Sequence, residues 1–210
     1  MPRNQEKEYV FNYYDTPANE DVVAMVEPNS KVLDIGCSTG RVAERLKKGK
    51  NCQVVGIETH PETAEVAKGR CDEVLKLNIE SLPNLNFPDG HFDVILFADV
   101  LEHCANPLEI LTHFKKYLSS GGYLVVSLPN VANWEVRLRV LFGQFDYKGG
   151  TLLDDGHLRF FTLKTAKELL SRAGFRIREF TIRNAKLKVL GKIWPTLFGW
   201  GFVFKAYKLN

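Results

Sequence analysis

Short apolar runs alternate with helix-like segments over most of this 210-residue chain. From these runs we expect strands at 31–35, 53–57, 73–77, 92–97 and 123–128. The alternation predicts β-α-β units, in which successive strands run parallel and helices cover both faces of the sheet. Two later apolar runs, at 175–184 and 202–208, have no full helix pattern between them. This predicts that one of the two runs antiparallel.

The composition is that of an ordinary globular protein, with 45% apolar and 25% charged residues. We expect a single domain over residues 1–210, with residues 130–161 as an insertion on the substrate side. The four cysteines are scattered without a Cys-x-x-Cys pair, so we expect reduced thiols and no metal site. The N-terminus lacks a signal-peptide pattern, and no apolar stretch approaches a membrane span, which predicts a cytoplasmic protein.

A turn with two glycines, Gly36-Cys37-Ser38-Thr39-Gly40, joins the first expected strand to the first expected helix. In open α/β sheets ligands bind beyond the carboxyl ends of the strands, so a ligand is expected here. Gly36 allows a sharp reversal of the chain, and Gly40 lets the helix pack close to the sheet. The N-terminus of that helix favours a negative group such as a carboxylate.

The turn alone is compatible with several sites. A dinucleotide site would need Gly-x-Gly-x-x-Gly, but Ser38 stands in mid-turn and Asp34, just before it, is a poor neighbour for a pyrophosphate. The run also reads as Gly-x-Ser-x-Gly, the nucleophile elbow of a serine hydrolase. Such an elbow normally lies several strands into its sheet, with oxyanion donors upstream. A tight turn without any ligand is the remaining structural interpretation.

Polar residues at the ends of the next two strands decide between these interpretations. Glu58 ends the second expected strand, where a carboxylate can accept hydrogen bonds from both ribose hydroxyls. Asn78 and Ile79 follow the third, where an amide oxygen and the backbone can pair with the edge of an adenine. The three features in order favour an adenosyl ligand, and together with Asp34 they favour S-adenosylmethionine.

The chain resembles the class I S-adenosylmethionine-dependent methyltransferases in four successive motifs. These are Val32-Leu33-Asp34-Ile35-Gly36-Cys37-Ser38-Thr39-Gly40, Gly56-Ile57-Glu58, Phe92-Asp93-Val94-Ile95 and Val100-Leu101-Glu102-His103. The similarity covers roughly Lys31 to Ile182. It implies an α/β, three-layer, Rossmann-like fold with a seven-stranded, mostly parallel sheet whose last strand is antiparallel. It also implies S-adenosylmethionine as cofactor and methyl transfer as activity.

The resemblance further implies which residues hold the cofactor. Asp34 and the turn backbone would hold the methionine part, Glu58 the ribose, and Asn78-Ile79 the adenine. The full expected set is Tyr14, Asp34, Gly36, Cys37, Ser38, Gly40, Glu58, Thr59, Asn78, Ile79 and Ala98. The family more often has glycine at the position of Ser38 and aspartate at that of Asn78. We therefore expect a slightly different loop and a weaker adenine contact.

Methyl transfer to a hydroxyl needs a group that removes the proton. Candidates lie after the fourth and fifth strands or in the insertion, and they are His103, Asn130 and His157. We expect His157 and His103 to be catalytic, with His157 favoured. A structural role is open for both: His103 as a cap before the next helix, and His157 as a loop anchor ahead of two phenylalanines.

The segment 157–162 and the turn at 129–130 resemble two subgroups of the family. One comprises small methyltransferases that accompany polysaccharide or lipid-linked sugar synthesis, which implies O-methylation of a small or lipid-linked acceptor. The other is the MetW-like group, which implies a cofactor-binding accessory protein of an acyltransferase. A serine hydrolase that uses Ser38 is a third, less favoured possibility.

Nucleic acid is not expected as a partner. The net charge is only +3, and Leu128-Pro129-Asn130 is not the tetrapeptide of the amino-methyltransferases. The C-terminal segment Lys186–Lys205 mixes lysines with large apolar residues. This pattern is compatible with peripheral membrane contact or, more readily, with a lid over the end of the sheet. The sequence carries no signal for the oligomeric state.

Overall fold

The structure is a computed structural model that describes residues 17–183 and 188–209. Tyr14, expected at the cofactor, lies outside the described residues. The sheet has seven strands in the order β3-β2-β1-β4-β5-β7-β6. Their bounds are β1 Lys31–Ile35, β2 Gln53–Glu58, β3 Glu73–Lys76, β4 Phe92–Ala98, β5 Leu118–Pro129, β6 Phe175–Arg183 and β7 Gly201–Lys208.

Strands β1 to β5 pair in parallel, whereas β7 runs antiparallel to both β5 and β6. The predicted antiparallel last strand is therefore confirmed. From β1 the chain moves outward through β2 and β3, and then returns to the other side of β1 to form β4. The strand order thus reverses between β1 and β4, and in sheets of this kind ligands bind at the carboxyl end of that switch point.

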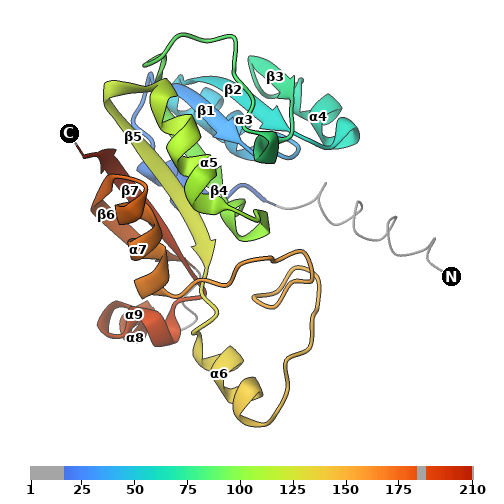
Figure 1. The fold of residues 1–210 in the computed structure, drawn as a ribbon, viewed down its shortest axis with the longest axis vertical. Helices are drawn as coiled ribbons and strands as arrows, with labels where there is room; N and C mark the ends of the chain where they lie inside the picture. The colour runs from blue at the N-terminus through green and yellow to red at the C-terminus, as the bar shows by residue number, and fades with distance from the viewer. Residues whose placement is uncertain (1–16, 184–187, 210) are drawn as a thin grey trace, which may run out of the picture.

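The α-helices are α2 Glu20–Met25, α3 Arg41–Lys50, α4 Pro61–Ala67, α5 Pro107–Phe114, α6 Trp134–Leu141, α7 Leu163–Arg172, α8 Lys188–Ile193 and α9 Pro195–Phe198. Three short 3-10 helices are η1 Ile79–Ser81, η2 Leu101–His103 and η3 Lys115–Tyr117. In Figure 1, α5 and α7 lie in front of the sheet. Apolar side chains of α2 and α3 pack with the opposite face. The predicted three layers are confirmed.

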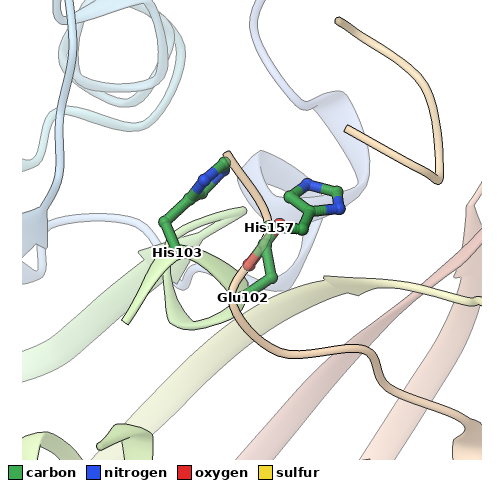
Figure 2. A group of neighbouring side chains, drawn as sticks. All are labelled: Glu102, His103 and His157. Carbon is green, nitrogen blue, oxygen red and sulfur yellow. The ribbon is translucent and has the colours of Figure 1, made fainter. Parts of the chain in front are cut away.

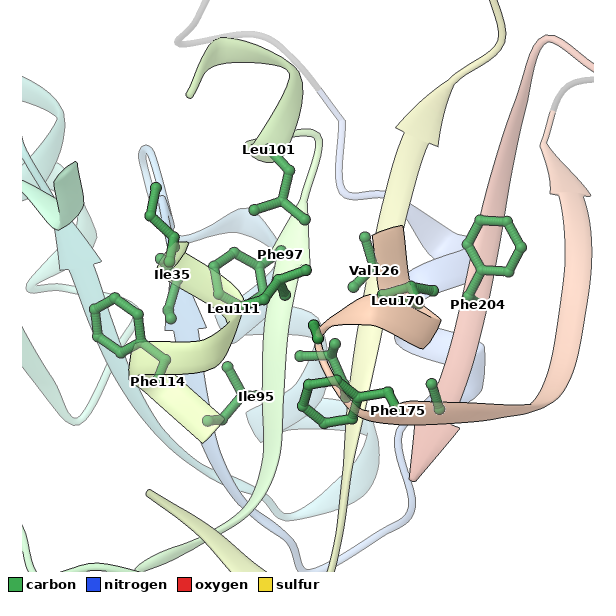
Figure 3. Close-up of a cluster of buried hydrophobic side chains, with 14 of the residues drawn as sticks. Ile35, Ile95, Phe97, Leu101, Leu111, Phe114, Val126, Leu170, Phe175 and Phe204 are labelled. Atoms are coloured by element: carbon green, nitrogen blue, oxygen red, sulfur yellow. The ribbon is translucent and has the colours of Figure 1, made fainter. Parts of the chain in front are cut away.

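The core is split by the sheet because successive side chains of a strand point to opposite faces. In β1, Val32 packs with α2 and α3, whereas Leu33 belongs to the cluster under α5 and α7. Figure 3 shows this second cluster, in which Leu111 and Leu170 lie over the sheet. Since these strands are buried on both faces, they read as continuous apolar runs in the sequence.

Between α6 and α7 the chain forms a long loop without a regular element. A small apolar cluster joins Val136 of α6 to Leu152 and Leu153 of this loop. Phe160 and Trp200 pack against it. The single-domain organisation and the boundaries 130–161 of the insertion stay predictions. Among the described residues, no helix is long and apolar enough to span a bilayer.

Candidate active site

The glycine turn lies at the switch point, between β1 and α3. Gly36, Ser38 and Gly40 all have positive φ, at 71°, 49° and 75°. The N–H groups of Gly36 and Cys37 donate to the carbonyl of Ile57, at 2.8 and 3.0 Å. A Cβ on Gly36 would lie 2.6 Å from Cγ2 of Val100. The turn therefore requires glycine at position 36 for both its conformation and its space.

Asp34 is a buried carboxylate beside this turn. Its side chain is 1% exposed, and Oδ2 has no hydrogen-bond partner within the described part of the chain. Burial, followed by the charge of Glu58, raises the pKa of Asp34 to about 7. A buried carboxylate without a partner is costly, and a cation in contact with it would remove the cost. Asp34 thus fits an ammonium group such as that of a methionine moiety.

Glu58 is held rigidly at the end of β2. One carboxylate oxygen accepts from the N–H of Ser38 and the other from the N–H of His60, each at 2.8 Å. Each oxygen keeps acceptor capacity, so two ribose hydroxyls can still be bound. Thr59 ties this strand end to the next one, because its hydroxyl donates to the carbonyl of Leu77 at 3.0 Å.

The expected adenine residues follow β3. The side-chain oxygen of Asn78 accepts from the N–H of Glu80 at 2.9 Å, so Asn78 caps η1 with the atom assigned to the adenine amine. Ile79 is 8% exposed and packs in the core. The sulfur of Cys37 packs against Gly56 and Cys71 and donates to the carbonyl of Ser38 at 3.8 Å. Ala98 ends β4, in line with the other strand ends.

The donor set fits the cofactor that the motifs imply. The unpartnered oxygen of Asp34 suits an ammonium, and the fixed carboxylate of Glu58 suits a ribose. How each of these residues contacts the cofactor stays a prediction.

Both predicted histidines lie in one cluster with a glutamate. Glu102 and His103 belong to η2, directly after β4, and His157 comes from the loop that precedes α7. Figure 2 shows the three side chains converging from these two segments. The rings of His103 and His157 are 4.9 Å apart between centroids, in an edge-to-face arrangement. We call Glu102, His103 and His157 the histidine cluster.

Backbone hydrogen bonds hold the cluster together. The N–H groups of Leu158 and Arg159 donate to the carbonyl of Glu102, at 2.8 and 2.9 Å. Nδ1 of His103 lies 2.9 Å from the carbonyl oxygen of Gly156. Because a carbonyl only accepts, Nδ1 carries a proton, and in the neutral ring the lone pair is then on Nε2.

The charges in the cluster are poorly solvated. Glu102 is 1% exposed, Oε2 has no partner among the described residues, and burial raises its pKa well above the ordinary value. Nδ1 of His157 is buried and equally without a partner there. Burial, followed by the charge of His103, lowers the pKa of His157, so this ring is neutral at pH 7. Glu102 belongs to the motif Val100-Leu101-Glu102-His103, but no pattern in the sequence predicts its burial.

The cluster adjoins the glycine turn through one side chain. Val100, which precedes η2, is the residue that a Cβ on Gly36 would strike. The cluster therefore lies at the same edge of the sheet as Asp34 and Glu58. This arrangement brings two imidazole rings and a buried carboxyl to the edge of the sheet where the cofactor is expected.

Asn130, the third candidate base, is wrong for that role. It is fully buried, and its amide nitrogen donates to the carbonyls of Thr196 and Gly199, each at 2.8 Å. Its side-chain oxygen accepts from the N–H of Ala132 at 3.1 Å. Asn130 therefore fastens the C-terminal segment to the end of β5 instead of meeting an acceptor.

A polar contact that follows the end of β4 was not predicted from the sequence. Asp99 forms an ion pair with Arg183 at the end of β6, and the amide of Asn19 lies 3.4 Å from Asp99 and 3.3 Å from Ser127. These residues come from four distant parts of the chain. No local spacing could have revealed the contact.

The C-terminal segment is only partly described, because Lys186 and Leu187 lie outside the described residues. Within it, Ile193 and Trp194 are 75% and 57% exposed, whereas Trp200 packs against the small apolar cluster. Peripheral membrane contact stays a prediction.

Comparison with known proteins places the chain in a family. A family model described as a methyltransferase domain matches residues 11–179. An uncharacterized protein of Methanocaldococcus jannaschii is 28% identical over 195 residues, which cover 84% of this chain and 74% of that protein. A ubiquinone biosynthesis O-methyltransferase of Xanthomonas campestris is 31% identical over 120 residues, which cover 54% of this chain and 50% of that enzyme. The chain thus matches about half the length of that enzyme.

Solved structures share the fold. A protein of Thermotoga maritima, described as an S-adenosylmethionine-dependent methyltransferase and possible histamine N-methyltransferase, is 24% identical with a TM-score of 0.67. The match covers 97% of this chain and 95% of that one. A methyltransferase of Archaeoglobus fulgidus is 20% identical with the same TM-score, over 96% of this chain and 99% of that one.

Proposed function

Because this chain belongs to the S-adenosylmethionine-dependent methyltransferases, we propose that it methylates a hydroxyl oxygen of a small or lipid-linked acceptor. S-adenosylmethionine supplies the methyl group on a sulfonium and leaves as a thioether. The chain itself must align the acceptor oxygen and dispose of its proton. A neutral amine carries its lone pair already, so the need to remove a proton distinguishes a hydroxyl acceptor.

The histidine cluster is the observation that carries this proposal. It lies beside the glycine turn, and His157 offers a buried nitrogen that makes no hydrogen bond within the described chain. His103 presents the lone pair of Nε2, since Nδ1 is held by Gly156. The ubiquinone biosynthesis relatives, which are named as O-methyltransferases, support oxygen as the acceptor atom.

Aromatic side chains beside the cluster favour an apolar acceptor. The ring of Phe160 lies 6.2 Å from that of His157 and 5.8 Å from that of Phe145, and Phe145 is 43% exposed. Leu158, next to His157, is 59% exposed. An apolar wall next to the two imidazoles suits a phenol or a lipid-bearing hydroxyl better than a strongly charged acceptor.

Replacement of His157 by asparagine is expected to lower kcat by about 100- to 10,000-fold, the usual contribution of a group that handles the proton. Affinity for S-adenosylmethionine should be unchanged, because His157 is not among the expected cofactor residues. The measurement is transfer of labelled methyl to a panel of phenols, catechols and hydroxyl-bearing lipids. His91→Asn is the matched control, since His91 precedes β4 at the opposite edge of the sheet.

Full turnover by His157→Asn would contradict the assignment. If the protein instead bound S-adenosylmethionine but methylated no acceptor, and an acyltransferase co-purified with it, the accessory role of the MetW-like group would replace the proposed function.

A further inference from the structure

We propose that the histidine cluster binds one divalent transition-metal ion of the Zn²⁺ type, and that this ion holds the acceptor oxygen. The second half of this inference rests on the proposed function, whereas the first half stands on the cluster alone. Glu102, His103 and His157 each offer one ligand atom, and these atoms all lie within 4.8 Å of one another. Two imidazoles and one carboxylate form the ligand set of catalytic zinc sites that keep a fourth position open.

One polar atom in each of two ligand residues makes no hydrogen bond within the described part of the chain. Oε2 of Glu102 and Nδ1 of His157 are buried, and neither meets a donor or acceptor in the described residues. Buried polar atoms without partners are rare because each costs about 1–3 kcal/mol. Protonation does not satisfy them, since an added proton would itself need an acceptor. A cation that faces both atoms satisfies them together.

The third ligand is already oriented as metal-bound histidines are. Such histidines donate their other ring N–H to a carbonyl or carboxylate, which fixes the tautomer. Nδ1 of His103 makes this bond to Gly156, and Nε2 is left as the free ligand atom. A Cβ on Gly156 would lie 3.1 Å from Nδ1 of His103, a tight contact, so glycine favours this close approach.

The loop that carries His157 is fixed independently of any ion. Arg159 donates from its guanidinium to the carbonyl of Ala105, at 3.1 and 2.5 Å, and from its N–H to the carbonyl of Glu102. The backbone of Leu152 hydrogen-bonds His157. The two carboxylate oxygens of Asp154, Oδ1 and Oδ2, accept from the N–H groups of Gly156 and Gly150 respectively. The ligands are thus presented on a braced segment.

Binding needs only a small contraction of the cluster. Bonds of about 2.1 Å in a tetrahedral site place ligand atoms roughly 3.4 Å apart. The separations of up to 4.8 Å therefore have to close by about 1.4 Å at most. Rotation of the side chains can supply this without movement of the backbone.

A bound ion changes how the hydroxyl proton is lost. An ion of this kind lowers the pKa of a bound hydroxyl, as it does for bound water. The O–H bond then breaks with its proton passing to solvent, and the oxygen–carbon bond forms as the carbon–sulfur bond of the cofactor breaks. Both histidines then promote loss of the proton through the ion that they hold, so His157→Asn is expected to lower kcat in this scheme as well.

The test is a calorimetric titration of the chelator-treated, full-length protein with Zn²⁺. We expect one equivalent to bind, and affinity to fall at least tenfold in Glu102→Gln and in His157→Ala. His91→Ala is the control and should match the wild type. Circular dichroism of each variant shows that it is folded. Titration with Co²⁺ should give visible bands of nitrogen and oxygen ligation without thiolate charge-transfer absorption.

Absence of stoichiometric binding, unchanged affinity in both variants, or thiolate absorption would overturn the metal site. Hydroxyl methylation that is unaffected by chelation would overturn the role of the ion and leave the proposed function standing. If the protein binds one equivalent of the ion but methylates only amines, the metal site stands and the proposed function is overturned.

Discussion

Replacement of Asp34 by asparagine is expected to weaken binding of S-adenosylmethionine by about 100-fold or more. Asp34 is 1% exposed and its Oδ2 has no partner in the described chain, so the ammonium of the cofactor is the cation that it would meet. Removal of one member of a buried charge pair costs about 2–5 kcal/mol, and about 3 kcal/mol corresponds to a factor of more than 100. Asparagine keeps the shape and loses the charge.

The same residue sets a pH dependence. The pKa of Asp34 is about 7 in the free protein, so the carboxyl is neutral below that pH and charged above it. Affinity of the wild type should therefore rise as the pH increases through 7, with proton release on binding below it. The amine of the cofactor titrates in the same way with the wild type and with Asp34→Asn. The difference between the two pH profiles therefore reports Asp34 alone. Equal pH profiles for the wild type and Asp34→Asn would contradict this account.

The stability of the free protein should fall as the pH rises, whereas the affinity for the cofactor should increase. A raised pKa in the folded state means that the neutral carboxyl is favoured there, so the stability it contributes is lost as the pH rises from about 4 through 7. At about 1.4 kcal/mol per pKa unit, the loss reaches roughly 4 kcal/mol. Asp34→Asn has no carboxyl to ionise, so it should become more stable relative to the wild type as the pH rises from about 4 to 7. Denaturant unfolding at pH 5 and pH 8 measures the change, and Asp93→Asn, on β4, is the control.

Replacement of Gly36 by alanine is expected to destabilise the fold by about 2–5 kcal/mol. The left-handed backbone, with φ of 71°, costs an alanine about 1–2 kcal/mol. Its Cβ would lie 2.6 Å from Val100, and overpacking of this kind costs about 1–3 kcal/mol. Because Val100 leads into η2, the displacement should also reach the histidine cluster and lower turnover.

Gly49→Ala is the matched control for Gly36→Ala. Gly49 lies within α3, and nothing lies within 4 Å of the position of its Cβ, so alanine there should stabilise by about 0.5–1 kcal/mol. A second change, Val100→Ala, should recover the steric part of the loss in Gly36→Ala and leave the backbone part. Denaturant unfolding of the wild type, Gly36→Ala, Val100→Ala and the double variant separates the steric cost from the backbone cost. Equal stability of the Gly36→Ala and Gly49→Ala variants would refute the steric argument.

Strand positions could be predicted because the strands are buried on both faces. The expected run 31–35 is β1 as observed. The lack of a full crossover-helix pattern between the last two runs predicted that one of them is antiparallel, and that strand is β7. The fifth strand was predicted too short, at 123–128. It begins at Leu118, which pairs with Phe92 before the register shifts. An irregular pairing of this kind leaves no period in the sequence.

Side-chain environments could not be predicted to the same extent. The sequence pointed to His103 and His157 separately, but the contact between them depends on the carbonyls of Gly156 and Glu102. For Asn130 the sequence suggested a chemical role that the structure does not support. Its side chain instead hydrogen-bonds the C-terminal segment. These outcomes depend on contacts between distant segments, which local spacing does not encode.

The central claim is that the glycine turn, Asp34 and Glu58 together bind S-adenosylmethionine, and calorimetric titration with this cofactor tests it most directly. The account predicts that the wild type binds one equivalent. It also predicts that Glu58→Ala loses measurable binding, because the variant lacks the ribose acceptors and the bond to the N–H of Ser38. No binding by the wild type, or full affinity in Glu58→Ala, would contradict it.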